Sequence, residues 1–333
     1  MKSIFLSDKP KKLMAVYDDA VTCELVSRAA LDTRIYSKAD VISDPTRFSD
    51  VEVIFSTWGM PSFSREEISA CFPALRCVFY AAGSVQAFAR PFLERGVRIF
   101  SAWAANAVPV AEYTVAQIIL ANKGFFAQAR LMAQERYKDA VGLRAESFGN
   151  YRARIGLIGC GMIGSLVAKM LREYDLEVAV FDPYLREEQR EALGVAVCSL
   201  EEIFEKSLVV SNHLANNAAT KGMLGYSLFA SMPRNATFIN TGRGAQVVEA
   251  ELVRALRERP DLTAVLDVTE PEPPEPSHPF YSLPNCYLTP HIAGSLGGEV
   301  VRMAEYMLEE HSCWSQGLPT RYEVSLKMLE TMA

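Results

Sequence analysis

The chain has 333 residues, of which 50% are hydrophobic and 22% are charged, and its formal net charge at pH 7 is −6. This length accommodates about two domains, and the composition excludes a disordered, collagen-like or coiled-coil protein. An acidic chain offers neither a basic surface for nucleic acid nor a polybasic segment for anionic lipid, so we expect neither partner.

The cysteines and the amino terminus bear on location and metal binding. The seven cysteines include no CxxC pair, which is typical of reduced thiols and predicts no structural zinc. No window approaches the about 18 consecutive apolar residues of a membrane span. The apolar patch in MKSIFLSDKPKK is too short for a signal peptide. We therefore expect a soluble, cytoplasmic protein without a metal site.

In the first hundred residues, short apolar runs alternate with helical patterns, which is typical of a parallel, doubly wound sheet. The predicted strands are 13–17, 51–58, 75–80 and 97–102, and the predicted helices are 21–31 and a short one near Ser64. A long helix over 108–122 follows, and then a polar stretch over 124–150 that we expect to be irregular.

A second alternating series begins at residue 154 and predicts another parallel sheet. Its strand-like runs are RIGLI, EVAVF, GVAVC, LVVSNH, ATFIN, LTAVLDV and CYLTP. A last helix over 297–314 follows, with no comparable strand run after it, and residues 321–333 show the pattern of a short amphipathic helix.

The segment GCGMIG, with Gly159, Gly161 and Gly164, lies between the strand RIGLI and a predicted helix. In a dinucleotide fold, glycines at this spacing allow a tight turn, the approach of a pyrophosphate, and close packing of helix on strand. The start of the helix offers free N–H groups to the phosphates. The alternative is that these glycines only shape a turn.

The next predicted strand ends at Asp182, 18 residues after Gly164. A carboxylate at this position accepts hydrogen bonds from the adenine ribose hydroxyls and repels a 2′-phosphate. The sequence therefore predicts NAD rather than NADP, although Arg186 follows closely enough to offer a phosphate contact.

Polar side chains follow three successive predicted strands at the edge where ligands bind. Arg243 follows ATFIN, Asp267, Glu270 and Glu272 lie at or after the end of LTAVLDV, and His291 follows CYLTP. Arginine binds a carboxylate through two parallel hydrogen bonds, and an imidazole beside a carboxylate transfers a proton near neutral pH. Together they suit a 2-oxo or 2-hydroxy acid. Taken singly, Arg243 is equally explained as a surface ion-pair partner and His291 as a strand-end cap.

The segments IGLIGCGMIG, FDP, NTGRG, LDVTEPEP and LTPHIAGS, in this order, resemble the D-isomer-specific 2-hydroxyacid dehydrogenase family. The preceding NAVPVAEYTVAQIILA is similar to the linking helix of that family. The resemblance implies an α/β protein with two doubly wound parallel sheets. A Rossmann NAD-binding domain over 107–296 would be inserted into a flavodoxin-like substrate domain formed by 1–106 and 297–333. It also implies a homodimer that forms through the NAD-binding domain.

Matched position by position, the resemblance implies that Arg243 binds the substrate carboxylate and that His291 is the catalytic acid and base. It makes Glu272 the acidic partner of the histidine, with Glu270 as a competitor. The implied cofactor-binding residues are Gly159, Gly161, Met162, Ile163, Gly164, Asp182, His213, Thr220, Thr241, Gly242 and Asp267. The implied substrate-binding residues are Ala82, Gly83, Ser84 and Arg243.

Some positions depart from the family pattern or stay open. Where the family usually has Val-Asp-Asn, this chain has Val85 followed by Gln86 and Ala87, and Ala215 stands where a proline is usual. Trp58 and Trp103 follow strands of the first domain and either line the substrate pocket or simply pack. His278 and His311 are expected to face solvent.

We expect an enzyme that interconverts a small 2-oxo acid and the matching D-2-hydroxy acid with NAD. One alternative is an NAD(H)-sensing, corepressor-like binding protein of the same fold without turnover. Another is a formate dehydrogenase, which is disfavoured because that branch has an amide in place of Glu272.

Overall fold

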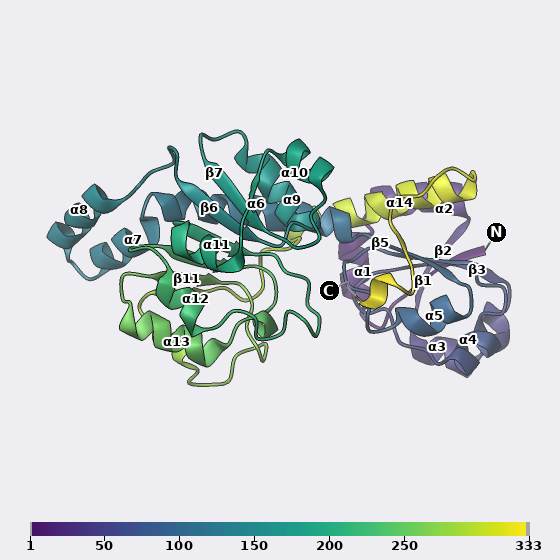
Figure 1. Ribbon diagram of the computed structural model, residues 1–333. Helices are drawn as coiled ribbons and strands as arrows, with labels where there is room; N and C mark the ends of the chain where they lie inside the picture. The colour runs from purple at the N-terminus through teal and green to yellow at the C-terminus, as the bar shows by residue number, and fades with distance from the viewer. Residues whose placement is uncertain (1, 331–333) are drawn as a thin grey trace. The chain divides into compact units, whose positions relative to one another are not determined.

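The computed structural model describes residues 2–330 and divides the chain into two compact units (Figure 1). Unit 1 is formed by Met1–Asn106 and Ser295–Ala333, and unit 2 by Ala107–Gly294. Each unit is built on a largely parallel sheet with helices on both faces, which confirms the predicted fold class.

Unit 1 has a six-stranded sheet in the order β13, β5, β4, β3, β1, β2. The strands are β1 (Lys2–Leu6), β2 (Leu31–Tyr36), β3 (Val51–Ser56), β4 (Cys77–Tyr80), β5 (Arg98–Ser101) and β13 (Glu323–Val324). The helices are α1 (Pro10–Val16), α2 (Asp19–Ala29), α3 (Lys38–Ser43), α4 (Arg65–Cys71), α5 (Ala89–Glu94) and α14 (Val301–Ser315), with short 3₁₀ turns η1 (Pro45–Phe48), η4 (Gly297–Val300) and η5 (Met328–Glu330). The first five strands are parallel in the flavodoxin order 2-1-3-4-5, whereas β13 is antiparallel to β5.

Successive strand residues point to opposite faces of a sheet, and in unit 1 both faces are buried under helices. Phe55, Phe79 and Phe100 form a stack on the face that α2 and α14 cover, with ring centroids 5.3 and 4.8 Å apart. Ile54 and Val78 point to the other face, where α3, α4 and α5 lie (Figure 1).

Both ends of unit 1 differ from the sequence prediction. Residues 13–17 belong largely to α1 rather than to a strand, since a short apolar run does not distinguish the two and Pro10 starts a helix here. The strands β1 and β2 were not predicted. The predicted helix over 321–333 is wrong in its described part, which forms β13 and η5, and 331–333 lie outside the described residues. Arg98 binds Glu323 with two hydrogen bonds and thereby pins β13 to the sheet edge.

Unit 2 has a parallel seven-stranded sheet in the order β12, β11, β10, β9, β6, β7, β8. The strands are β6 (Arg154–Ile158), β7 (Glu177–Phe181), β8 (Ala196–Val197), β9 (Val209–Asn212), β10 (Thr237–Asn240), β11 (Thr263–Leu266) and β12 (Cys286–Leu288). The helices are α6 (Trp103–Asn122), which begins in unit 1, α7 (Phe125–Ala133), α8 (Tyr137–Glu146), α9 (Met162–Leu171), α10 (Glu187–Leu193), α11 (Leu200–Lys206), α12 (Tyr226–Ser231) and α13 (Glu249–Glu258), with 3₁₀ turns η2 (Gly244–Gln246) and η3 (Pro279–Tyr281). The strand order reverses between β6 and β9, and ligands bind at the carboxyl ends of strands at such a reversal.

The segment 103–150 is more helical than predicted. The helix α6 begins at Trp103 rather than 108, and the stretch expected to be irregular forms α7 and α8. The sequence does not show the apolar periodicity of a helix over α8, because Ala140 is the one residue that this helix buries. Among the described helices, α6 is long and apolar enough to cross a membrane by length and composition, but 56% of its apolar window is buried inside the structure.

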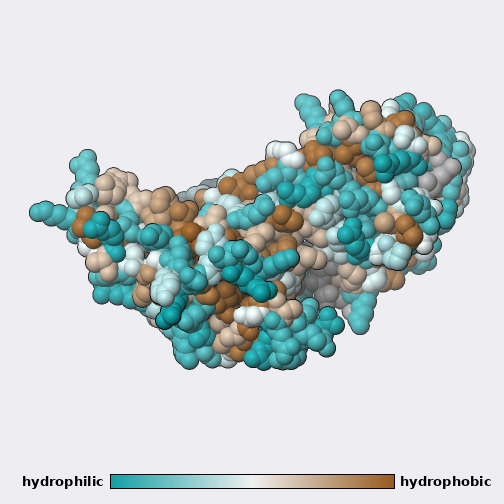
Figure 2. Space-filling view, turned by 90° about the horizontal axis from the view of Figure 1, so that it is seen from above, coloured by the Kyte–Doolittle hydropathy of each residue, from teal (hydrophilic) through white to brown (hydrophobic). Residues whose placement is uncertain are grey.

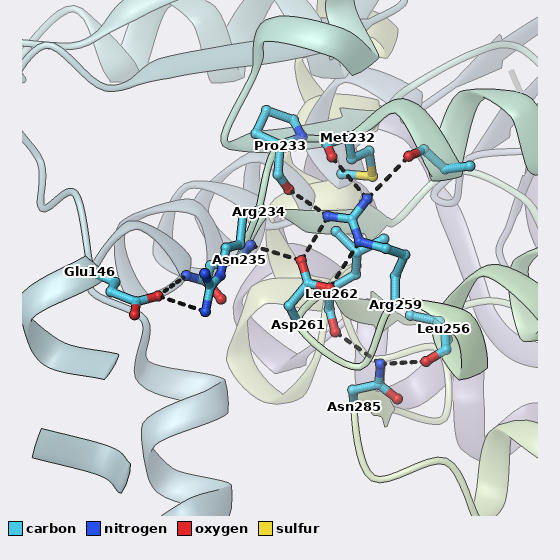
Figure 3. Close-up of polar contacts among 11 residues, drawn as sticks. Glu146, Met232, Pro233, Arg234, Asn235, Leu256, Arg259, Asp261, Leu262 and Asn285 are labelled. Atoms are coloured by element: carbon cyan, nitrogen blue, oxygen red, sulfur yellow. Dashed lines mark hydrogen bonds and ion pairs between the residues drawn. The ribbon is translucent and has the colours of Figure 1, made fainter. Parts of the chain in front are cut away.

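A hydrogen-bonded cluster closes the amino-terminal edge of the unit 2 sheet (Figure 3). Arg259 binds Asp261 through Nη2, at 2.7 Å, and donates from Nη1 to the carbonyl oxygen of Met232, at 3.2 Å. Asn285 donates from Nδ2 to the carbonyl oxygen of Leu262, at 2.9 Å. These polar groups satisfy turns and helix ends, so their role is structural. The candidate site lies at the opposite edge.

The prediction that His311 and His278 face solvent is wrong. His311 lies on the inner face of α14 with 0% exposure, and its ring centroid is 5.5 Å from that of Phe55 and 5.4 Å from that of Phe79. Burial lowers the pKa of His311 from 6.5 to about 4. His278 is partly buried, and its Nδ1 accepts the N–H of Phe280.

His311 makes the stability of unit 1 depend on pH. The unfolded chain takes up a proton near pH 6.5 that the folded core resists down to about pH 4, so stability falls as pH falls through this window. Between pH 8 and pH 5, the free energy of unfolding is expected to fall by about 2 kcal/mol less in His311→Phe than in the wild type. Urea unfolding followed by tryptophan fluorescence reports on unit 1, which holds all three tryptophans. Equal losses in both proteins would contradict a neutral buried His311.

Candidate active site

The turn after β6 is closed tightly by two of its glycines. Gly159 has a φ of +88°, and a Cβ there would lie 2.8 Å from the carbonyl oxygen of His213. A Cβ on Gly164 would overlap the carbonyl group of Gly159. Both positions therefore require glycine for the strand, the turn and α9 to pack.

The start of α9 is open. A Cβ on Gly161 would meet no atom within 4 Å, and no side chain caps the helix. The first N–H groups of α9, which include those of Met162 and Ile163, thus point out of an uncapped helix start. This arrangement fits the pyrophosphate of a dinucleotide.

Asp182 lies beside the glycine turn, at the end of β7. Its Oδ2 accepts the N–H of Cys160 at 2.7 Å, and its Oδ1 accepts the N–H of Tyr184 at 2.8 Å. Each carboxylate oxygen has a second acceptor position, so both remain able to bind a hydroxyl group. The carboxylate is partly exposed and suits the role predicted for it.

His213 and Thr220 support the loop after β9. His213 is 9% exposed, its Nε2 lies 3.0 Å from Ser211 Oγ, and burial lowers its pKa to about 4. Thr220 donates from Oγ1 to the carbonyl oxygen of Ala215, at 2.6 Å. The geometry assigns both to packing and loop structure, and cofactor contact by either stays a prediction.

Arg243 follows β10, and its guanidinium is partly enclosed by the loop. Its Nη1 donates to the carbonyl oxygen of Gly242, at 2.8 Å. Burial lowers the pKa of Arg243, and the nearby carboxylate of Glu272 partly offsets this effect. Thr241, just before it, is buried, with Oγ1 3.2 Å from that of Thr114 on α6. This threonine therefore ties the loop to the helix.

Asp267, at the end of β11, organises the loop that carries His291. Its carboxylate is 2% exposed and accepts hydrogen bonds from Thr289 Oγ1 at 2.6 Å, from Ile292 N at 2.8 Å and from Ala293 N at 2.9 Å. Its carbonyl oxygen accepts the N–H of His291. His291 itself has a φ of +55°, in the left-handed region, which the surrounding hydrogen bonds hold in place.

The structure brings Glu272, rather than Glu270, to the histidine. Glu272 Oε1 lies 2.7 Å from His291 Nδ1, and the two side chains are 42% and 45% exposed. Glu270 is anchored through its backbone, which donates to Glu249 Oε1 at 2.8 Å. With Nδ1 held by a carboxylate, Nε2 of His291 is the nitrogen available for a substrate oxygen.

The pair borders a cleft of about 390 Å³ in unit 2, whose lining includes Asp267, Thr269, Glu272, Tyr281, Leu288 and His291. This volume suits a small organic ligand. Within residues 2–330, no group of three or more His, Cys, Asp or Glu side chains is placed to hold a metal ion.

In unit 1, the turn after β4 exposes backbone donors. Ser101 Oγ binds the carbonyl oxygens of Ala82 and Gly83, at 2.8 and 2.6 Å, and Ala82 N donates to Tyr80. Within the part of the chain that the structure describes, the N–H groups of Gly83 and Ser84 meet no protein acceptor. Two free adjacent N–H groups suit a carboxylate.

The two tryptophans of interest are packed in unit 1. Trp58 contacts both core clusters of this unit, and Trp103 meets Tyr322 edge-on, with ring centroids 5.7 Å apart. Both are partly buried, so the structure gives each a packing role, and pocket lining by either stays a prediction.

Sequence reasoning missed three buried amides beneath the Arg243 loop. Asn212, Asn240 and Gln246 are 0%, 1% and 0% exposed, and they hydrogen-bond to one another and to the loops after β9 and β10. For the two asparagines, the available signal was an amide at the end of an apolar strand, in VVSN and TFIN.

Residues 115–293, more than half of the chain, match the model of the D-isomer specific 2-hydroxyacid dehydrogenase family, NAD binding domain. The chain therefore belongs to this family, and unit 2 contains its NAD-binding domain. This confirms the predicted family and the predicted cofactor.

Individual relatives have several activities. A D-3-phosphoglycerate dehydrogenase from Archaeoglobus fulgidus is 29% identical over 237 residues, which are 71% of this chain and 44% of that protein. The chain thus spans less than half of that relative's length. A glyoxylate reductase from Korarchaeum cryptofilum is 29% identical over 75% of this chain and 76% of that protein. A phosphoglycerate oxidoreductase from Rhizobium etli has the same fold, with a TM-score of 0.80 at 22% identity, covering 98% of this chain and 99% of that one.

The carboxylate of Asp182 is expected to set cofactor preference. Wild-type protein should bind NADH over NADPH by more than about tenfold, and Asp182→Asn should narrow this ratio by about tenfold, because it removes the charge and keeps an acceptor for Cys160 N. Fluorescence titration of both cofactors measures the ratio, with Arg186→Ala as the control for a phosphate contact. Equal affinity of the wild type for both cofactors would remove Asp182 from this role.

Proposed function

We propose that this protein reduces a small 2-oxo acid to the D-2-hydroxy acid with NADH, or catalyses the reverse oxidation. The observation that carries this proposal is the 2.7 Å contact between His291 Nδ1 and Glu272 Oε1 beside the cleft in the NAD-binding unit. A histidine held by a carboxylate in this way is an acid and base for a carbonyl or hydroxyl group. Membership of the family supports the same reaction class.

We assign substrate binding to a guanidinium group and to free backbone N–H groups. Arg243 offers two parallel hydrogen bonds to a carboxylate. The free N–H groups of Gly83 and Ser84 suit the same kind of anion, although the family pattern after Val85 is not kept. The open start of α9 and the carboxylate of Asp182 fit NAD.

When bound, the nicotinamide supplies or accepts the hydride. In reduction, His291 donates a proton from Nε2 to the carbonyl oxygen, and in oxidation it accepts the hydroxyl proton. Glu272 orients the ring through the contact with Nδ1. Asp267 holds the loop on which His291 lies, and Arg243 orients the acid.

A homodimer through unit 2 is proposed from the surface of α7, α8 and their flanks. Phe125, Met132, Tyr137, Phe148 and Tyr151 are all exposed there. Figure 2 shows brown and tan hydrophobic patches among teal at the end of unit 2 that carries α7 and α8. Exposed apolar side chains gathered in this way are typical of an interface between proteins. Analytical ultracentrifugation of the wild type checks the mass.

A cytoplasmic location is also proposed. All seven cysteines are free in the structure, which suits a reducing compartment. Alkylation of the native protein isolated from cells tests whether the thiols are reduced there.

A panel of 2-oxo acids tests the reaction. Glyoxylate, pyruvate, hydroxypyruvate and phenylpyruvate are supplied with NADH, and formate with NAD, and the absorbance of NADH is followed. We expect reduction of at least one oxo acid and a loss of about tenfold or more in kcat/KM for Arg243→Lys, because lysine does not reproduce the two-pronged contact. NADH binding without turnover of any acid would favour the NAD(H)-sensing alternative.

Two matched variants distinguish the carboxylates. Glu272→Gln should lower kcat/KM for reduction by about tenfold or more, because it replaces the charged acceptor that orients His291 through Nδ1 with a neutral amide. Glu270→Gln should stay within about twofold of wild type, because its link to the loop is the backbone N–H bound by Glu249. The reverse ranking in steady-state kinetics would assign the role to Glu270.

A further inference from the structure

We propose that Gln246 is a positioning residue that holds Arg243 in place and ties it to the loop after β9. The proposal rests on the function assigned above to Arg243. Gln246 closes the 3₁₀ turn η2, three residues after the arginine, and is 0% exposed. A buried primary amide needs partners for both its oxygen and its nitrogen, so those partners show what it holds.

The oxygen of Gln246 faces the arginine loop. Oε1 accepts the backbone N–H of Arg243 at 3.2 Å and Nδ2 of Asn212 at 2.6 Å. A Cβ on Gly242 would lie 3.0 Å from this oxygen and 3.1 Å from Asn212 Nδ2, so the loop backbone passes close to the amides. Gln246 therefore supplies the acceptor for the arginine's own peptide group.

The nitrogen of Gln246 faces the other way. Nε2 donates to the carbonyl oxygens of Leu214 and Ala215, at 2.7 and 3.1 Å. These residues follow His213 in the loop beside the glycine turn. A single side chain thus spans the predicted substrate loop and a loop predicted to contact NAD.

Two asparagines complete the arrangement. Asn240 donates from Nδ2 to the carbonyl oxygen of Arg243 at 3.1 Å, and its Oδ1 accepts the N–H of Gly242 at 3.0 Å. Asn212 donates to both Asn240 Oδ1 and Gln246 Oε1. Both peptide groups of the arginine are consequently held by buried side chains.

These contacts matter for the arginine's direction. A guanidinium binds a carboxylate productively only when its planar fork is aimed correctly, and small displacements at such a contact reduce rates strongly. Replacing Gln246 with methionine keeps a similar shape, but it leaves Arg243 N and Leu214 O without this partner and leaves Ala215 O with the hydroxyl of Thr220 as its donor. The arginine loop should then become more mobile and aim less accurately.

Asn285 provides a matched control at the far edge of the same sheet (Figure 3). It is 2% exposed and donates from Nδ2 to the carbonyl oxygens of Leu256 and Leu262, at 3.0 and 2.9 Å. Its amide therefore holds two backbone carbonyls, as that of Gln246 does, but at the amino-terminal edge of the strands. Asn285→Leu should lower the stability of the protein without changing the geometry of the site.

The experiment compares wild type, Gln246→Met, Gln246→Glu and Asn285→Leu. KM and kcat are measured for the best 2-oxo acid of the panel, NADH affinity by fluorescence, melting temperature by circular dichroism, and amide hydrogen exchange in peptides that cover 213–216 and 241–247. Gln246→Met should raise KM by about tenfold or more, keep NADH affinity within about threefold, and speed exchange in both peptides by about tenfold. Asn285→Leu should melt earlier with unchanged KM and unchanged exchange there.

Several outcomes would overturn the proposal. They are an unchanged KM in Gln246→Met, unchanged exchange at 241–247, or an equal rise of KM in Asn285→Leu. If Gln246→Met does not fold, Gln246→Glu decides instead, because it keeps an acceptor for Arg243 N but replaces the donor to Leu214 and Ala215, and faster exchange at 213–216 is then required. If the wild type turns over no acid, the proposed function fails, and the exchange data alone decide the role of Gln246.

Discussion

The buried carboxylate of Asp267 is the constraint on which the arrangement of the site depends. A carboxylate with 2% exposure is costly unless donors surround it. Here the donors are the hydroxyl of Thr289 and the N–H groups of Ile292 and Ala293. Because these donors belong to the loop that carries His291, the bonds that satisfy the carboxylate also place the histidine. The left-handed backbone of His291 is tolerated for the same reason.

Buried polar side chains also hold the loops after the neighbouring strands β9 and β10. The strands β9, β10, β11 and β12 are neighbours in the sheet, so the loops that follow them meet at one edge. Buried amides join the first two loops, and the Asp267 carboxylate joins the last two. Uncharged amides hold the arginine loop without adding a charge that would compete for the guanidinium with the acid proposed to bind it. The polar side chains predicted to contact a ligand, Arg243 and His291, are thus held by buried polar side chains that do not contact it.

Much of this site could be predicted from sequence, because its residues lie directly at strand ends. Parallel strands bring residues such as Arg243, Asp267 and His291 to one edge, whatever the rest of the fold does. Glu272 was harder, since a proline-rich loop does not reveal which of two glutamates turns toward the histidine. The amides of Asn212 and Gln246 were missed because their partners are other buried amides and backbone groups of neighbouring loops, which periodicity does not show.

The fold was predictable where apolar runs are long and flanked by turn residues, as in β6 and β9. The errors lie where tertiary packing overrides a weak local signal. The run in α1 is too short to separate helix from strand, α8 has almost no buried face, and His311 looks polar until α14 is placed against the aromatic stack of unit 1.

The most direct test of this account is the state of the His291 ring, read by nitrogen NMR of protein labelled at its four histidines. At neutral pH the expected spectrum contains a hydrogen-bonded Nδ1 proton that disappears in His291→Gln, as the contact with Glu272 requires. The same signal should be lost or weakened in Asp267→Asn, in which an amide NH₂ group replaces one of the two oxygens that accept from the loop. A wild-type His291 with the spectrum of a free imidazole, or a signal unchanged in Asp267→Asn, would contradict the claim that the buried carboxylate places His291.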